Sequence, residues 1–116
     1  MCGIAGIMTA NDALPQAQVL DGFARALAHR GPDGKGRYSG AGVGLVQTRL
    51  AIIDLKTGDQ PLYSADRNLA LVFNGEIYNA PELRRTLEAK GHRFVTDHSD
   101  TEVILRGYEE IGRAHV

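Results

Sequence analysis

The chain has 116 residues, enough for one compact domain that buries about two thirds of the surface of its unfolded form. Its composition is that of an ordinary soluble protein, with 43% hydrophobic residues, 23% charged residues and a formal net charge of -1. This balance indicates contact with neither nucleic acid nor membrane, and the apolar start lacks the basic flank of a targeting signal, so we expect a cytoplasmic protein.

Short apolar runs between turn-forming residues predict strands, and apolar residues at helical spacing predict helices. In chain order we expect a strand at residues 2–8, a helix at 15–28, strands at 42–47, 51–55 and 69–73, and helices at 80–90 and from 99 onward. Pro15 suits the first turn of the first helix, and Gly91 ends the second. The segment from Ser99 to Glu102 has the form of a capping box for the third.

The predicted strands do not alternate regularly with helices. This order favours an α+β fold with mainly antiparallel strands over a doubly wound parallel sheet. About four strands and three helices give thin cover for the mixed sheet of an enzyme, so we expect the fold to be incomplete in these residues. No repeat or linker divides the chain, and we interpret residues 1–116 as the N-terminal part of one domain.

Cys2 is the single cysteine, so the chain can form neither an intramolecular disulfide nor a cysteine-based zinc cluster. A lone cysteine is most often a small buried hydrophobic residue, but the position of this one favours chemistry. Initiator methionine is normally removed before a small residue, which would give Cys2 a free α-amino group beside its thiol. Because an α-amine titrates near neutral pH, nucleophile and base could reside in one residue.

The sequence gives no sign of a metal or nucleotide site. The histidines are scattered without the spacing that is typical of zinc ligands, so we expect no metal site. These histidines are His29, His92, His98 and His115. No Walker A or pyrophosphatase-type loop occurs, and we therefore expect this chain to bind neither ATP nor magnesium by itself.

Six segments, in order along nearly the whole chain, resemble the class II glutamine amidotransferases. They are MCGIAGI (residues 1–7), HRGPDG (29–34), RLAIIDL (49–55), QPL (60–62), FNGEIYN (73–79) and SDTEVIL (99–105). Within that class the resemblance is to the glutamine-hydrolysing asparagine synthetases. Relatives that form glucosamine phosphate or phosphoribosylamine usually carry His-Asn-Gly where this chain has Phe73-Asn74-Gly75. Each segment alone is a weak signal, but chance does not place so many in register.

The resemblance implies an N-terminal nucleophile (Ntn) hydrolase fold, which is a four-layer α/β/β/α sandwich. It implies that Cys2 attacks the carboxamide of glutamine, releases ammonia and leaves a thioester that water hydrolyses to glutamate. In the full-length enzyme, a separate synthetase domain would use ATP and magnesium to activate aspartate and would receive the ammonia to form asparagine. These residues would then hold only the glutaminase part, without a cofactor, and the resemblance also allows a homodimer.

The same resemblance assigns substrate-binding residues around position 49. Arg49 would bind the α-carboxylate of glutamine, a role that suits a planar guanidinium with paired donors. Leu50, Ala51, Ile52 and Ile53 would line the pocket, mainly through backbone groups.

A second set of residues would stabilise charge. Asn74 and Gly75 resemble the oxyanion hole of the family, with the asparagine amide and the glycine N–H directed at the developing negative charge. Glu76 and Asp100 would hold the α-ammonium group of glutamine. By sequence alone, Asn-Gly is also a common hairpin turn, and Asp100 is also a favourable carboxylate in the first turn of a helix.

Two other functions stay open at this stage. The ammonia acceptor could differ, as in exopolysaccharide or peptide modification, because the acceptor domain determines that choice. The chain could also be a non-catalytic fragment that binds glutamine without turnover. One visible departure from the family is that Gln47 and Thr48 stand where many relatives have a histidine or arginine just before Arg49.

Overall fold

The computed structural model describes residues 1–51 and 58–112. Its helices and strands in chain order are β1 (Gly3–Met8), α1 (Ala17–Leu27), β2 (Gly34–Gly40), β3 (Val43–Arg49), β4 (Leu62–Tyr63), β5 (Ala70–Leu71), α2 (Ala80–Ala89) and α3 (Asp100–Ile111). Short 3-10 turns flank α1 at Ala10–Asp12 and Ala28–Arg30. Strands β1, β3 and β2 form an antiparallel sheet in that order, and β4 pairs antiparallel with β5.

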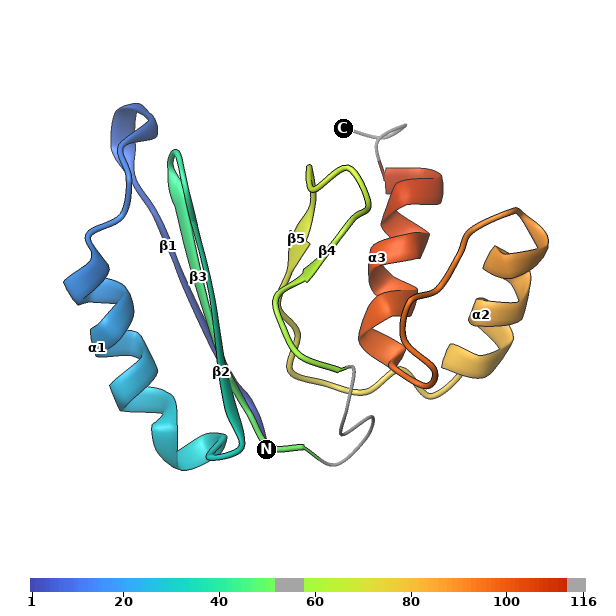
Figure 1. The fold of residues 1–116 in the computed structure, drawn as a ribbon, viewed down its shortest axis with the longest axis horizontal. Helices are drawn as coiled ribbons and strands as arrows, with labels where there is room; N and C mark the ends of the chain where they lie inside the picture. The colour runs from blue at the N-terminus through green and yellow to red at the C-terminus, as the bar shows by residue number, and fades with distance from the viewer. Residues whose placement is uncertain (52–57, 113–116) are drawn as a thin grey trace.

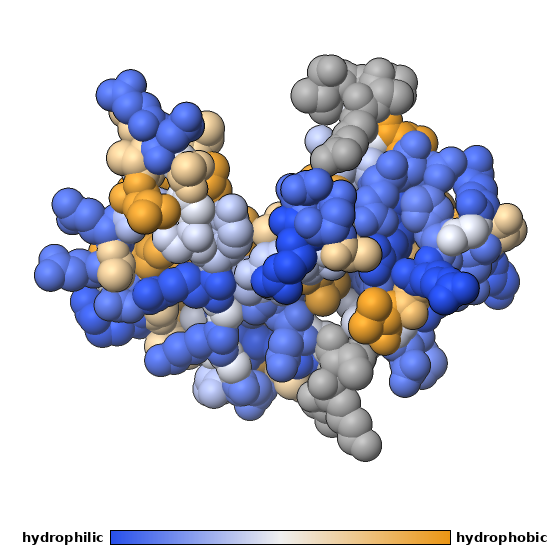
Figure 2. Space-filling model, turned by 45° about the horizontal axis from the view of Figure 1, so that its top comes forward, coloured by the Kyte–Doolittle hydropathy of each residue, from blue (hydrophilic) through white to orange (hydrophobic). Residues whose placement is uncertain are grey.

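Figure 1 shows the elements side by side across the molecule, in the order α1, three-stranded sheet, β4–β5 pair, α3 and α2. Helix α1 packs on β3, whereas α3 contacts both β4 and α2. The molecule thus has two halves, one of α1 with the three-stranded sheet and one of the β4–β5 pair with α2 and α3. They meet near the N-terminus, and Figure 2 shows an open notch between them at the other end. The architecture is thus α+β, as expected. In the part of the chain that the structure describes, no helix has the length and apolar character needed to cross a bilayer.

A first small core joins α1 to the three-stranded sheet. Leu20 of α1 and Val46 of β3 are each 1% exposed. Gly44 permits this contact, because an added Cβ would lie 2.8 Å from a methyl carbon of Leu20. Side chains alternate along a strand, so positions 44 and 46 face α1 and leave Gln47 and Arg49 on the opposite face.

A second core joins α2 to α3 and fixes the loop that leads into α2. Ala80, Leu87 and Val103 are buried together, with Ile77 and Phe94 packed against them. Burial of such side chains stabilises the fold by about 1.5–3 kcal/mol each for the larger ones. Because Ile77 belongs to this cluster, the segment between β5 and α2 is anchored at its C-terminal end.

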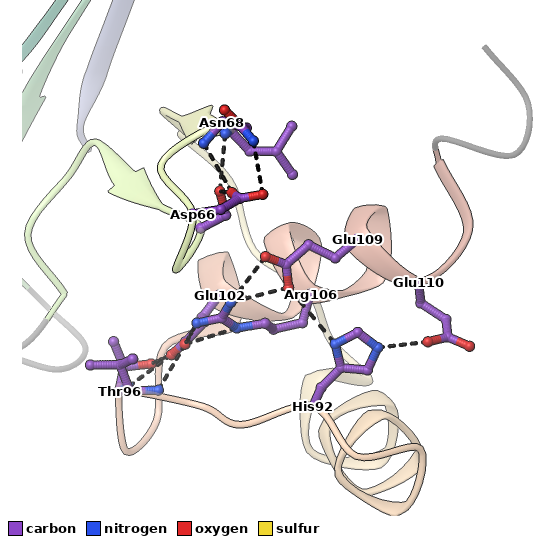
Figure 3. Close-up of polar contacts among 11 residues, drawn as sticks. Asp66, Asn68, His92, Thr96, Glu102, Arg106, Glu109 and Glu110 are labelled. Atoms are coloured by element: carbon purple, nitrogen blue, oxygen red, sulfur yellow. Dashed lines mark hydrogen bonds and ion pairs between the residues drawn. The ribbon is translucent and has the colours of Figure 1, made fainter.

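A buried acidic side chain organises the start of α3 (Figure 3). Glu102, 2% exposed, accepts hydrogen bonds from the Val95 N–H at 2.8 Å, the Thr96 N–H at 2.7 Å and Arg106 Nη2 at 3.0 Å. Burial acts to raise the pKa of Glu102. The hydrogen bond from the Thr96 hydroxyl, together with those just named, outweighs burial and holds that pKa below its usual value. The predicted capping box is therefore wrong, since Glu102 binds the preceding loop and Ser99 makes no side-chain cap bond.

Replacing this carboxylate should destabilise the fold. We expect Glu102→Gln to lower the free energy of unfolding by about 3 kcal/mol, because it leaves the buried Arg106 with a weakened partner. The folded pKa is depressed, so the wild-type advantage is full above the ordinary pKa of 4.5 and is lost as pH falls from that value through the lower pKa of the folded state. Urea denaturation at neutral and acidic pH measures both effects. Glu109→Gln, at the more exposed partner of Arg106, is the matched control and should cost less than about 1 kcal/mol; equal losses in the two variants would contradict the expectation.

Most of the predicted elements are present, with shifted ends. The strand at residues 2–8 and the helix at 80–90 are confirmed, while the strand predicted at 69–73 shrinks to Ala70–Leu71. Pro15 does not begin the first helix, which starts at Ala17; it is buried beside Gly44 instead. The strand predicted at 51–55 lies mostly outside the described residues.

Candidate active site

A cavity of about 480 Å³ lies where the ends of the sheet strands meet the loops that lead into α2 and α3. Most of the predicted site residues line this cavity. They are Cys2, Arg49, Leu50, Asn74, Gly75, Glu76 and Asp100. Ala51 does not line it and instead donates its N–H to Asp33 Oδ2 at 2.9 Å. Ile52 and Ile53 lie outside the described residues.

Cys2 is fixed by the end of β3 and by the loop that follows α1. The Leu50 N–H donates to Cys2 Sγ at 3.3 Å, and the Leu50 carbonyl lies 3.6 Å from the same sulfur. Arg30 Nε donates to the Cys2 carbonyl at 3.2 Å. The thiol is half-buried at the cavity wall, whereas Met1 is 70% exposed and also lines the cavity.

The HRGPDG loop holds the end of β3 in place. An added Cβ at Gly31 would lie 2.4 Å from the Arg49 nitrogen, so only glycine fits against the strand there. Asp33 donates its N–H to the Arg49 carbonyl at 2.9 Å. The loop therefore positions the backbone of Arg49.

Arg49 is buried in the wall of the cavity, with 7% of its surface exposed. Its Nη1 donates to Asp59 Oδ1 at 2.7 Å, and the side chain of Asp59 is 85% exposed. The guanidinium group is thus oriented toward an exposed carboxylate. This is the kind of charge-assisted contact that an amino-acid carboxylate would make.

The Asn74–Gly75 segment is a packed loop. Residues 72–79, all of them described, form no strand, so Asn-Gly is not the turn of a two-stranded hairpin. An added Cβ at Gly75 would lie 2.7 Å from Cζ of Phe73, which shows that the phenyl ring folds over the glycine. Asp100 Oδ2 accepts the Ile77 N–H at 2.9 Å and ties the loop to the start of α3.

Comparison with known proteins defines the family. A family model described as a glutamine amidotransferase domain matches residues 1–116. The chain belongs to this glutamine amidotransferase family.

The similar proteins are glutamine-hydrolysing asparagine synthetases. The chain is 45% identical over 114 residues to asparagine synthetase 1 of Arabidopsis thaliana, covering 97% of the chain and 19% of that protein. Identity to asparagine synthetase 1 of Bacillus subtilis (strain 168) is 43% over 111 residues, or 93% of the chain and 17% of that protein. Identity to the asparagine synthetase of Sandersonia aurantiaca is 44% over 118 residues, or 100% of the chain and 22% of that protein. The chain thus spans about a fifth of the length of these curated relatives.

Among the described residues, the charged side chains on the wall of the cavity are one cation and two acids. They are Arg49, Glu76 and Asp100. Such a set complements an amino-acid zwitterion, with the cation for its carboxylate and the acids for its ammonium group. Within residues 1–51 and 58–112, no three His, Cys, Asp or Glu side chains lie close enough together to hold a metal ion.

Two glutamines that the sequence analysis left out of the site also line the amidotransferase cavity. Gln47 is 1% exposed, and among the described residues its Nε2 has no hydrogen-bond partner. Its place two residues before Arg49 on one strand was the signal that could have identified it. Gln60 accepts the Phe73 N–H at 2.6 Å and donates to Thr101 Oγ1 at 3.4 Å. Gln60 belongs to the QPL segment that resembles the family, but the resemblance assigned no role to this residue.

Proposed function

We propose that this amidotransferase domain hydrolyses glutamine to glutamate and ammonia, with Cys2 as its N-terminal nucleophile. One observation carries the proposal: the Cys2 thiol, Arg49, the Asn74–Gly75 segment and Asp100 line a single cavity although they are far apart in sequence. The family match supports the choice of glutamine as the substrate.

Substrate binding follows from the charges. Arg49 pairs with the α-carboxylate of glutamine, which takes the place of the exposed Asp59 at the guanidinium group. Glu76 and Asp100, which also line the cavity, receive the α-ammonium group. The side-chain carboxamide then lies toward Cys2, since both ends of the zwitterion are held elsewhere.

The reaction is a double displacement at the carboxamide carbon. After removal of Met1, the α-amine of Cys2 takes the thiol proton, and the sulfur forms a bond to that carbon. The Asn74 amide and the Gly75 N–H stabilise the oxyanion. The proton then passes to the departing nitrogen, ammonia is released, and a glutamyl thioester remains on Cys2. Water, deprotonated by the same amine, attacks the thioester carbonyl carbon, and the sulfur leaves with that proton as the thiol, giving glutamate.

The acceptor of the ammonia is proposed from the relatives, which are asparagine synthetases by name. In the full-length protein we expect the ammonia to serve ATP-dependent conversion of aspartate to asparagine in a separate domain. The test measures asparagine formed by the full-length gene product from glutamine, aspartate and ATP. Glutamine hydrolysis without asparagine would favour another acceptor, and glutamine binding without hydrolysis would favour a non-catalytic fragment.

We also propose that the domain has the four-layer Ntn hydrolase architecture. Its support is the order of the elements, in which α1 covers the three-stranded sheet and α3 covers the β4–β5 pair, so that sheets are enclosed between helices. The N-terminal position of Cys2 in front of β1 is consistent with this class of fold.

The active form should begin at Cys2. Met1 is 70% exposed, so a methionine aminopeptidase can reach it, and its removal frees the amine that the mechanism needs as a base. Intact-mass measurement of the purified protein should show loss of one methionine. As a control, a preparation that keeps Met1 or carries an acetylated α-amine should hydrolyse glutamine at least about a hundredfold more slowly. Full activity in such a preparation would exclude the α-amine as the base.

A further inference from the structure

We propose that Gln60 is a positioning residue. It fixes two parts of the site relative to the sheet that carries Arg49: the loop at residues 73–77, called the oxyanion-stabilising loop because it holds Asn74 and Gly75, and the ammonium-binding end of α3, which begins at Asp100. The inference rests on the proposed glutaminase function. It concerns a side chain that the family resemblance marks without assigning a role.

The first contact joins Gln60 to the oxyanion-stabilising loop. Gln60 Oε1 accepts the N–H of Phe73 at 2.6 Å, slightly shorter than the usual separation of about 2.7–3.2 Å for an N–H to oxygen hydrogen bond. Phe73 directly precedes Asn74, and its ring packs over Gly75. The side chain of Gln60 therefore controls the backbone position of the residue from which both proposed oxyanion donors follow.

The second contact joins Gln60 to α3. Gln60 Nε2 donates to Thr101 Oγ1 at 3.4 Å, and Thr101 is 6% exposed. The neighbouring Asp100 accepts the Ile77 N–H at 2.9 Å. Gln60 thus holds the loop at Phe73, and Asp100 holds it at Ile77. Thr101 connects the two supports, because it bonds to Gln60 and directly follows Asp100.

The third contact places the backbone of Gln60 on the three-stranded sheet. Gly36 of β2 stands opposite Gln47 of β3, and an added Cβ at Gly36 would lie 1.6 Å from the Gln60 carbonyl oxygen. No residue other than glycine leaves room for this approach. One residue therefore links the sheet, the loop and the helix, and Gln60 itself lines the cavity that they enclose.

Both ends of the Gln60 carboxamide are engaged with protein groups, so its effect on the reaction passes through other residues. A displacement of about 1 Å in an active site can cost about a hundredfold in rate. Loss of the Phe73 contact should displace the oxyanion donors and lower kcat. Loss of the Thr101 contact should loosen the ammonium-binding end of α3 and raise KM.

The test compares Gln60→Met with Gln60→Glu in the full-length gene product. Methionine keeps the length of the side chain but has neither polar contact, and we expect kcat for glutamine hydrolysis to fall about ten- to hundredfold with a higher KM. Glutamate can accept from both the Phe73 N–H and the Thr101 hydroxyl, so it should restore kcat to within about fivefold of wild type. Melting temperatures should be nearly unchanged in both variants. The rate of Cys2 alkylation by iodoacetamide should also be nearly unchanged; it measures the reactivity of the thiol without requiring turnover of glutamine.

The outcomes separate this role from the proposed function. A wild-type kcat in Gln60→Met, or equal losses in both variants with a changed alkylation rate of Cys2, would overturn the positioning role. Cys2→Ala is assayed in parallel. If it still hydrolyses glutamine, the proposed function fails together with the role that rests on it; if it is inactive, the Gln60 result is read as above.

Discussion

Asn74→Ala is expected to lower kcat for glutamine hydrolysis by about a hundredfold to a thousandfold while changing KM little. The Asn74 amide would contact charge that appears only in the transition state, so its removal should leave binding of the ground state intact. Steady-state kinetics of the full-length gene product measures this split. The loop should persist without this side chain, because Phe73 and Ile77 anchor it through their backbone N–H groups.

Arg49→Ala is the matched contrast to this variant. Arg49 would contact a carboxylate that does not change during the reaction, so its loss should mainly raise KM. Thermal melts of both variants exclude unfolding, which matters because Arg49 is buried. A kcat within a few-fold of wild type in folded Asn74→Ala would reduce Asn74 to a loop residue and remove it from the oxyanion hole.

Cys2→Ala is expected to abolish glutamine hydrolysis, because no other group can form the thioester. In the full-length protein it should spare any synthesis that uses free ammonia, since that reaction needs no nucleophile in this domain. Ammonia release from glutamine and product formation from added ammonium are measured side by side. Alanine fits where the thiol now contacts the Leu50 backbone, so the fold should tolerate it. Loss of both activities would indicate misfolding, and retained hydrolysis would exclude Cys2 as the nucleophile.

The sequence predicted the elements whose side chains carry a clear period, such as β1 and α2. It missed β2, because GKGRYSG holds three glycines and two basic residues and has no β-branched side chain. That strand forms through its antiparallel pairing with β3, and Gly36 is needed there for the approach of Gln60. Neither the pairing with β3 nor the approach of Gln60 can be predicted from the strand propensity of these seven residues.

The site was predicted in a similarly uneven way. Family segments pointed to Cys2, Arg49 and Asp100, and the structure brings these to one cavity. Gln60 could be noticed in its segment but not understood, since its partners lie 13 and 41 residues further along the chain. Contacts at such separations become visible only when the loops are folded against the sheet.

Alkylation of Cys2 tests most directly whether its thiol is the nucleophile for glutamine. The protein is treated with iodoacetamide, the modified fraction of Cys2 is measured by peptide mapping, and ammonia release from glutamine is measured on the same samples. We expect activity to fall in proportion to the modified fraction, and we expect saturating glutamine to slow the modification because it covers the thiol. Full hydrolysis of glutamine by protein whose Cys2 is completely alkylated would contradict the proposed mechanism.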